Sequence, residues 1–184
     1  MSMTPAPGED TSVALALVNT WYGDPNGFVD DLGPQWLRTR SLASAPRVSA
    51  PEFMELIGLR AAIRELFTAL ADQREPAADS VALVNDCARR WPIAPQLAWP
   101  PDGPRREWSG GTESNGVDEA IATIARDAID VVCGDRAPTV RRCAAHGCVR
   151  IFFRAHARRQ WCSNTCGDRV RAARHYLRQT GRAS

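Results

Sequence analysis

At 184 residues, with a formal net charge of +2, the chain has room for one ordinary domain and a small second module. The charge is uneven, because residues 141–184 hold 11 arginines and one acid (+10) whereas residues 1–140 hold 12 arginines and 20 acids (−8). No apolar run approaches the length of a membrane span, and the first residues lack a secretory signal. We therefore expect a soluble cytoplasmic protein with no membrane partner.

Helical patterns fill residues 11–136, which we interpret as a helical N-terminal domain after a disordered leader over residues 1–10. Asp10 is the expected cap of the first helix, and a Gly- and Pro-containing run at 23–27 predicts a break after it. The fourth helix is expected to start at Ser80, with Asp79 or Ser80 as its cap. The expected helices cover residues 11–21, 34–43, 53–73, 80–90 and 117–133.

The third helix has the strongest end signals. Ser49 and Glu52 have the spacing of a capping box, and Pro76 prevents the helix from continuing. Between the fourth and fifth helices, residues 96–99 and 105–109 flank a Pro-Asp-Gly turn. This pattern predicts a short β hairpin.

Arg60 and Arg64 fall on the apolar face of the third helix. An unpaired buried guanidinium is costly, so each must meet an anion or several carbonyl groups. One alternative is a carboxylate or carbonyl of the protein itself. The other is a small anionic effector bound between helices, with Asn19 and Thr20 as further ligand-binding residues.

Four cysteines near the C-terminus have the spacing of a metal site. Four residues separate the first two and three separate the last two, so two tight loops can bring four thiolates into the tetrahedron that Zn²⁺ prefers. Four sulfur ligands leave no open position, which predicts a structural zinc. Two disulfides, unrelated thiols or an iron–sulfur cluster are the alternatives. The predicted ligands are Cys143, Cys148, Cys162 and Cys166.

The remaining cysteines and the histidines have simpler interpretations. Cys87 and Cys133 lie in apolar helical patterns and are expected to be buried, inert thiols. His146 and His156 are expected to be exposed, although either could replace a cysteine at the metal. No nucleophile–base arrangement appears in the sequence, so we do not expect an enzyme.

Residues 137–184 are expected to form a small zinc module. Residues 149–153 are β-prone and predict a ribbon, and Ser163 predicts the start of a helix that runs to about Gln179. The arginines of this module could contact the phosphate backbone of DNA, or instead a protein partner or the acidic residues 1–140. The candidate nucleic-acid-binding residues are Arg158, Arg159, Arg169, Arg171, Arg174 and Arg178.

These motifs resemble a known family. The Arg-Arg-Gln-Trp-Cys-Ser run at 158–163 and the Cys-Gly-Asp-Arg run at 166–169 are similar to the CGNR zinc finger of bacterial stress-induced transcription regulators. Asp168 stands where that family has Asn. The Leu-Val-Asn-Thr run at 17–20 resembles the opening motif of the family's N-terminal ABATE domain, and residues 59–67 resemble its arginine-bearing helix.

The resemblance implies a helical domain that senses a small molecule and a finger that binds DNA. We therefore expect a mainly α protein: a helical N-terminal domain with a short β hairpin, followed by a four-cysteine zinc finger made of a β ribbon and a C-terminal helix. The expected function is a zinc-binding transcription regulator of the stress response, with DNA as partner and a small anionic effector. The alternative is a protein-interaction adaptor whose basic finger binds a partner or its own acidic body. No heptad seam defines an oligomeric state.

Overall fold

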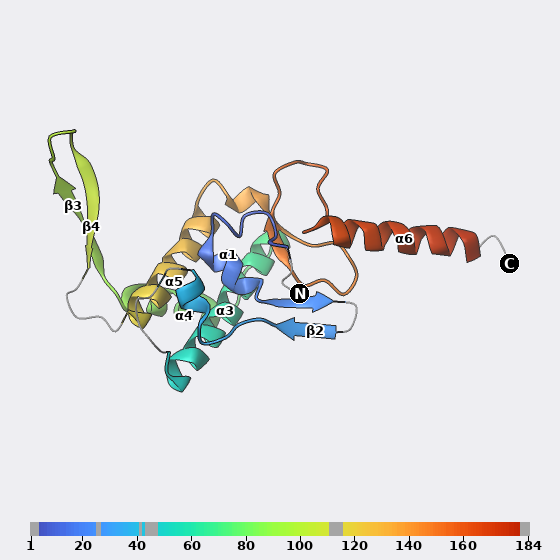
Figure 1. Ribbon diagram of the computed structural model, residues 1–184, viewed down its shortest axis with the longest axis horizontal. Helices are drawn as coiled ribbons and strands as arrows, with labels where there is room; N and C mark the ends of the chain where they lie inside the picture. The colour runs from blue at the N-terminus through green and yellow to red at the C-terminus, as the bar shows by residue number, and fades with distance from the viewer. Residues whose placement is uncertain (1–3, 25–26, 41, 43–47, 111–115, 181–184) are drawn as a thin grey trace.

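The structure, a computed structural model, describes residues 4–24, 27–40, 42, 48–110 and 116–180 (Figure 1). It consists of a helical body and a small C-terminal module, so the expected fold class is confirmed in outline. The elements are α1 (Val13–Val18), β1 (Trp21–Asp24), β2 (Gly27–Asp30), α2 (Trp36–Thr39), α3 (Ala50–Ala71), α4 (Ala78–Arg89), β3 (Ile93–Ala98), β4 (Arg105–Gly110), α5 (Val117–Cys133), the 3-10 turn η1 (Ala137–Thr139), β5 (Val140–Arg142), β6 (Ile151–Phe153) and α6 (Asn164–Thr180).

The core lies where α3, α4 and α5 pack on one another and α1 contacts α3 and α5. Apolar side chains of these helices fill it, with Leu15 and Phe67 among the largest that are fully buried. Val140 of β5 and Ile151 and Phe153 of β6 belong to the same cluster. The ribbon of the C-terminal module is therefore packed into the core of the body.

The end signals of α3 are confirmed. The Ser49 side chain accepts a hydrogen bond from the Glu52 amide, and the Glu52 carboxylate accepts one from the Ser49 amide. The helix ends at Ala71, before Pro76. Its buried face is apolar except for Arg60, as the periodicity predicts.

The first expected helix is wrong at both ends. α1 starts after Ser12 rather than after Asp10, because the Ser12 hydroxyl accepts a hydrogen bond from the Leu15 amide at 3.2 Å. It ends at Val18, and the chain then enters the antiparallel β1–β2 pair, which the sequence did not predict. Of the run at 23–27, Gly23 and Asp24 end β1 and Gly27 begins β2, and the two residues between them lie outside the described ranges.

Two other helices also differ from expectation. α2 is a single turn, and part of the expected helix at 34–43 lies outside the described residues. α4 begins at Ala78 and has no side-chain cap. Instead, the Ala77 amide donates to the Glu65 carboxylate of α3 at 3.2 Å, so a tertiary contact replaces the local cap expected at Asp79 or Ser80.

The expected disordered leader is wrong for residues 4–10, and residues 1–3 lie outside the described part of the chain. Ala6 is buried beside Phe152, and the Pro7 carbonyl accepts a hydrogen bond from the Phe153 amide at 2.9 Å. The segment packs because it covers the apolar ribbon of the C-terminal module.

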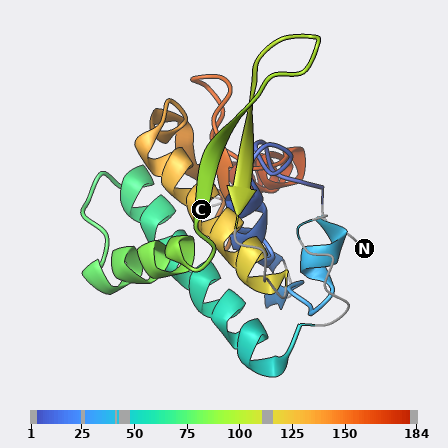
Figure 2. The same ribbon diagram turned by 90° about the vertical axis from the view of Figure 1, so that its left-hand side faces the viewer.

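Two elements project from the body at opposite ends of the molecule. The antiparallel β3–β4 hairpin, which the sequence predicts, extends from one end, and α6 extends from the other (Figure 1). Seen from the hairpin end, α6 lies behind the body (Figure 2). Among the described residues, no helix combines the length and the apolar character that crossing a membrane requires.

Candidate metal centre

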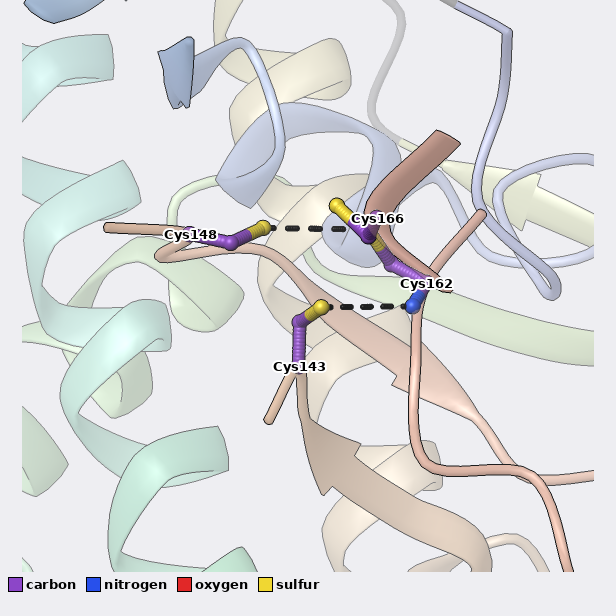
Figure 3. A group of neighbouring side chains, drawn as sticks. All are labelled: Cys143, Cys148, Cys162 and Cys166. Carbon is purple, nitrogen blue, oxygen red and sulfur yellow. Dashed lines mark hydrogen bonds between the residues drawn. The ribbon is translucent and has the colours of Figure 1, made fainter. Parts of the chain in front are cut away.

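Two loops and the first turn of α6 bring the four predicted cysteines together (Figure 3). Cys143 follows β5, Cys148 precedes β6, and Cys162 and Cys166 flank the start of α6. Their sulfur atoms all lie within 4.8 Å of one another. In the described residues, no other group of three or more potential ligands meets the same criterion.

Backbone hydrogen bonds shape both loops. The Cys148 amide donates to the Ala145 carbonyl at 3.0 Å, closing the turn that contains Gly147 at a φ of 74°. The Cys166 amide donates to the Ser163 hydroxyl at 3.2 Å, which confirms Ser163 as the cap of α6. The Cys162 amide donates to the Cys143 sulfur at 3.4 Å, so the second loop also orients a ligand of the first.

The sulfur positions fit a single tetrahedral ion. The Sγ atoms of Cys148 and Cys162 are 3.7 Å apart, and those of Cys162 and Cys166 are 3.6 Å apart. A tetrahedron with Zn–S bonds of about 2.3 Å has edges of about 3.8 Å. All six cysteines are free thiols, which excludes the disulfide alternative in this structure. His146 and His156 are exposed, as expected.

The close packing of the thiols opposes their joint ionisation. Hydrogen bonds from Cys148 and Cys162 lower the pKa of Cys143 to about 2, and the hydrogen bond with Cys143, together with burial, raises the pKa of Cys148 to about 12. The pKa of Cys162 is also raised, first by its hydrogen bond with Cys143. A divalent cation between the sulfurs would remove this conflict by stabilising all four thiolates.

Arg169 lies beside the metal site, apart from the exposed arginines with which it was grouped. Its Nη2 lies 3.8 Å from the Cys166 sulfur, where a guanidinium offsets part of the negative charge of a tetrathiolate. Asp168 accepts a hydrogen bond from Arg171 at 2.5 Å.

The other five candidate nucleic-acid residues differ in how they are held. Arg158 and Arg174 are exposed and form no ion pair within the described part of the chain. Arg178 is exposed and donates to the Arg174 carbonyl at 3.3 Å. Arg171 donates a hydrogen bond to Asp168 and lies over the Trp161 ring. Arg159 is half-buried, since it donates to the carbonyls of its own loop.

Arg60 meets a carboxylate of the chain, the first of the two alternatives. Its guanidinium donates two hydrogen bonds to Asp30, at 2.5 and 2.7 Å, and a third to the Thr20 hydroxyl at 2.9 Å. The hydrogen bond from Arg60 lowers the pKa of Asp30. The β1–β2 hairpin, which carries Asp30, thus supplies a partner that the helical pattern could not reveal.

Arg64 and Asn19 connect the body to the zinc module. Arg64 donates to the carbonyls of Val18 and Trp21 and, at 2.7 Å, to that of Val149, next to Cys148. Burial lowers the pKa of Arg64 to about 10, so it stays charged at neutral pH. The Asn19 side chain accepts from the Ile151 amide at 3.0 Å and donates to its carbonyl at 2.8 Å. The donors expected to bind an effector are thus engaged by the chain itself.

Two protein-family models match the chain. The ABATE model, described as "Putative stress-induced transcription regulator", covers residues 11–135, more than half of the chain. The chain belongs to the ABATE family. The CGNR zinc finger model matches residues 139–179 of this ABATE protein, including all four cysteines, so the resemblance drawn from the motifs is confirmed and the cofactor is a structural zinc. A search of curated proteins finds no match.

Sequence reasoning missed an ion pair that fixes the finger of this ABATE protein. Arg150 of the finger and Glu9 of the N-terminal segment are both buried, and Arg150 Nη2 lies 2.5 Å from Glu9 Oε1. Glu9 Oε1 also accepts from Asn19 at 2.7 Å, and Arg150 donates to the Thr4 carbonyl at 3.0 Å. The only sequence signal for it is a charged residue inside the β-prone stretch at 149–153.

A close backbone approach adds to this contact between body and finger. A Cβ on Gly23 of β1 would lie 2.0 Å from the Gly147 carbonyl oxygen, so only glycine fits there. The β1–β2 hairpin thus lies directly against the loop that carries Cys148.

The two cysteines outside the metal centre differ from each other. Cys87 is buried in the core, as expected, and burial raises the pKa of its thiol. Cys133 is exposed at the end of α5, so the expectation of a buried thiol there is wrong.

Proposed function

We propose that this ABATE protein is a zinc-dependent transcription regulator whose CGNR finger binds DNA mainly through α6. The observation that carries the proposal is the position of this helix, which leaves the body and exposes every residue from 171 to 179 (Figure 1). A helix that is polar on most sides gains little from its own protein, and three exposed arginines on it favour a polyanionic partner. These arginines are Arg171, Arg174 and Arg178.

Zinc supports this role by anchoring the helix. Cys162 and Cys166 hold the first turn of α6 against the ribbon, and the ribbon is packed into the core. The helix is thereby presented in a fixed direction, and the exposed Arg158 of the preceding loop adds a further positive charge. A stress-responsive regulator of this kind would work in the cytoplasm, where bacterial DNA lies, and would not need catalysis.

The adaptor remains the second candidate, and one observation favours it. Tyr176 and Leu177 on α6 are 66% and 68% exposed, and such side chains suit a protein partner better than a phosphate backbone. The finger does dock on its own body through the ribbon, but α6 projects away from the helical body (Figure 1).

Salt dependence separates the two candidates. We expect the affinity for a mixed-sequence DNA duplex, measured by fluorescence anisotropy, to fall linearly in a log–log plot against salt, with a slope of about −0.9 per phosphate contact. The Arg171→Ala/Arg174→Ala/Arg178→Ala variant should bind more weakly and flatten the slope by about 2.7.

The matched control removes the same charge from exposed positions of the body, in the variant Arg38→Ala/Arg89→Ala/Arg105→Ala. It should bind like the wild type. DNA binding that ignores both salt and the α6 substitutions would contradict the proposal and favour the adaptor.

A further inference from the structure

The β3–β4 hairpin has one apolar and one polar face. Cross-strand partners point to the same face, and alternate residues along a strand share a face. The pairs Pro95–Trp108 and Leu97–Arg106 therefore lie on one face, and the pair Gln96–Glu107 lies on the other. The apolar face is open to solvent, since Leu97 is 73% and Trp108 59% exposed, and Trp99 beside the turn is 74% exposed.

A groove of about 740 Å³ continues this face at the base of the hairpin. Trp108 belongs to both the apolar face and the groove. The wall of the groove opposite the hairpin is α5. Its apolar lining includes Trp91, Ile93 and Ile129. The wall carries three carboxylates and one guanidinium, those of Glu119, Asp127, Asp130 and Arg126.

Two carboxylates of the groove form no direct ion pair with a described residue, although Arg126 attracts both of them. Arg126 donates to the carbonyls of Ala88 and Trp91. Asp127 accepts a hydrogen bond from Ser12 and is ion-paired with Arg136 at 3.6 Å. Glu119 and Asp130 are exposed and form no ion pair in the described residues. On the hairpin, Arg106 lies over the Trp108 ring and also has no carboxylate partner there, whereas Arg105 is paired with Glu107 on the polar face.

We propose that the hairpin is a dimerisation arm that occupies the groove of a second copy of this chain. Two hairpins related by a two-fold axis lie with their apolar faces together, so that the tip of each reaches the groove at the base of the other. The contact is isologous, and it pairs Arg106 of one copy with Asp130 or Glu119 of its partner.

Length, charge and area support a second copy as the occupant. The six residues of each strand span roughly 20 Å, which brings the tip of one arm to the base of an antiparallel partner. The cation on the apolar face complements the carboxylates of the groove. Full burial of Trp99 and Trp108 would remove roughly 200–330 Å² per copy, about a third of what a specific interface buries on each side. A two-stranded hairpin is also marginal alone, so covering its apolar face would stabilise it.

The proposal does not depend on DNA binding, but it has a consequence for it. The hairpin and α6 lie at opposite ends of the body, so a dimer joined by its arms would carry its two fingers at the outer ends (Figure 1). Such a dimer would suit two half-sites on DNA.

Sedimentation equilibrium of the full zinc-loaded chain tests the proposal at concentrations up to about 100 µM. We expect a dimer, and we expect Leu97→Arg to raise its dissociation constant at least about tenfold, because it places a charge on the buried face. Gln96→Arg adds the same charge at the adjacent position on the other face and should leave the dimer intact.

A charge exchange between the hairpin and α5 tests whether a variant loses the dimer only because its hairpin is misfolded. Arg106→Glu and Asp130→Arg should each weaken the dimer, and the double variant should recover it, because α5 of one copy would again face an opposite charge on the other. A monomeric wild type, equal effects of Leu97→Arg and Gln96→Arg, or no recovery in the double variant would overturn the proposal. If the wild type is a monomer, the exposed apolar face of the hairpin would be explained instead by binding to a different protein.

Discussion

Removal of zinc is expected to unfold the finger and to lower the thermal stability of the helical body as well. A structural zinc in finger peptides contributes about 10–16 kcal/mol to folding. Here Cys162 and Cys143 pack with Phe152, while the flanking Ile151 and Phe153 belong to the main core. Loss of the metal therefore reaches the body through the ribbon. We expect Cys162→Ser to lose stoichiometric zinc in elemental analysis and to lower Tm by on the order of 10 °C.

Cys133 supplies the matched control, because it is exposed and lies outside the metal centre. Cys133→Ser should retain one zinc per chain and the wild-type melting curve. If Cys162→Ser lost its metal but melted like the wild type, the finger would be energetically separate from the body, in conflict with the shared core.

The second large effect is expected from Glu9→Ala. Arg150 is 3% and Glu9 8% exposed, so the substitution leaves a buried guanidinium without its carboxylate. Breaking such a pair costs about 3–5 kcal/mol, which in a protein of this size lowers Tm by roughly 6–20 °C. Thermal unfolding followed by circular dichroism measures the change.

Two variants test the cause of that loss. Asp10→Ala removes a carboxylate from the adjacent exposed position and should have little effect. In the Glu9→Ala/Arg150→Met variant both charges are absent, so much of the lost stability should return. A Glu9→Ala protein as stable as the wild type would mean that the N-terminal segment does not hold the finger.

Local patterns predicted the parts of the protein that local chemistry determines. Cysteine spacing alone identified the zinc ligands, because two short loops leave few ways to arrange four sulfurs. The capping box at Ser49 and the turn between β3 and β4 were likewise visible, since both depend on residues close together in the chain.

Long-range polar contacts could not be predicted in this way. The periodicity placed Arg60 and Arg64 on a buried face, but nothing in the sequence named Asp30 or the Val149 carbonyl as their partners. The same limit hid the role of Glu9, whose carboxylate meets a residue 141 positions later in the chain. Composition suggested a leader without structure there, because the apolar surface that it covers comes from the ribbon.

Most hydrogen bonds between the body and the finger are made with the main chain of the finger. Asn19 grips both backbone groups of Ile151, Arg64 binds the Val149 carbonyl, Gly23 abuts the Gly147 carbonyl, and Pro7 bonds the Phe153 amide. These backbone contacts do not depend on the side chains of the finger, whereas the ion pairs of Arg142 and Arg150 and the apolar packing of the ribbon do. The solvent-facing residues of the finger, and with them its binding target, could therefore change in evolution while its contact with the body is kept. Grafting a foreign finger onto this body should succeed when the graft keeps the backbone path, Gly147, Arg150 and the apolar ribbon residues that enter the core.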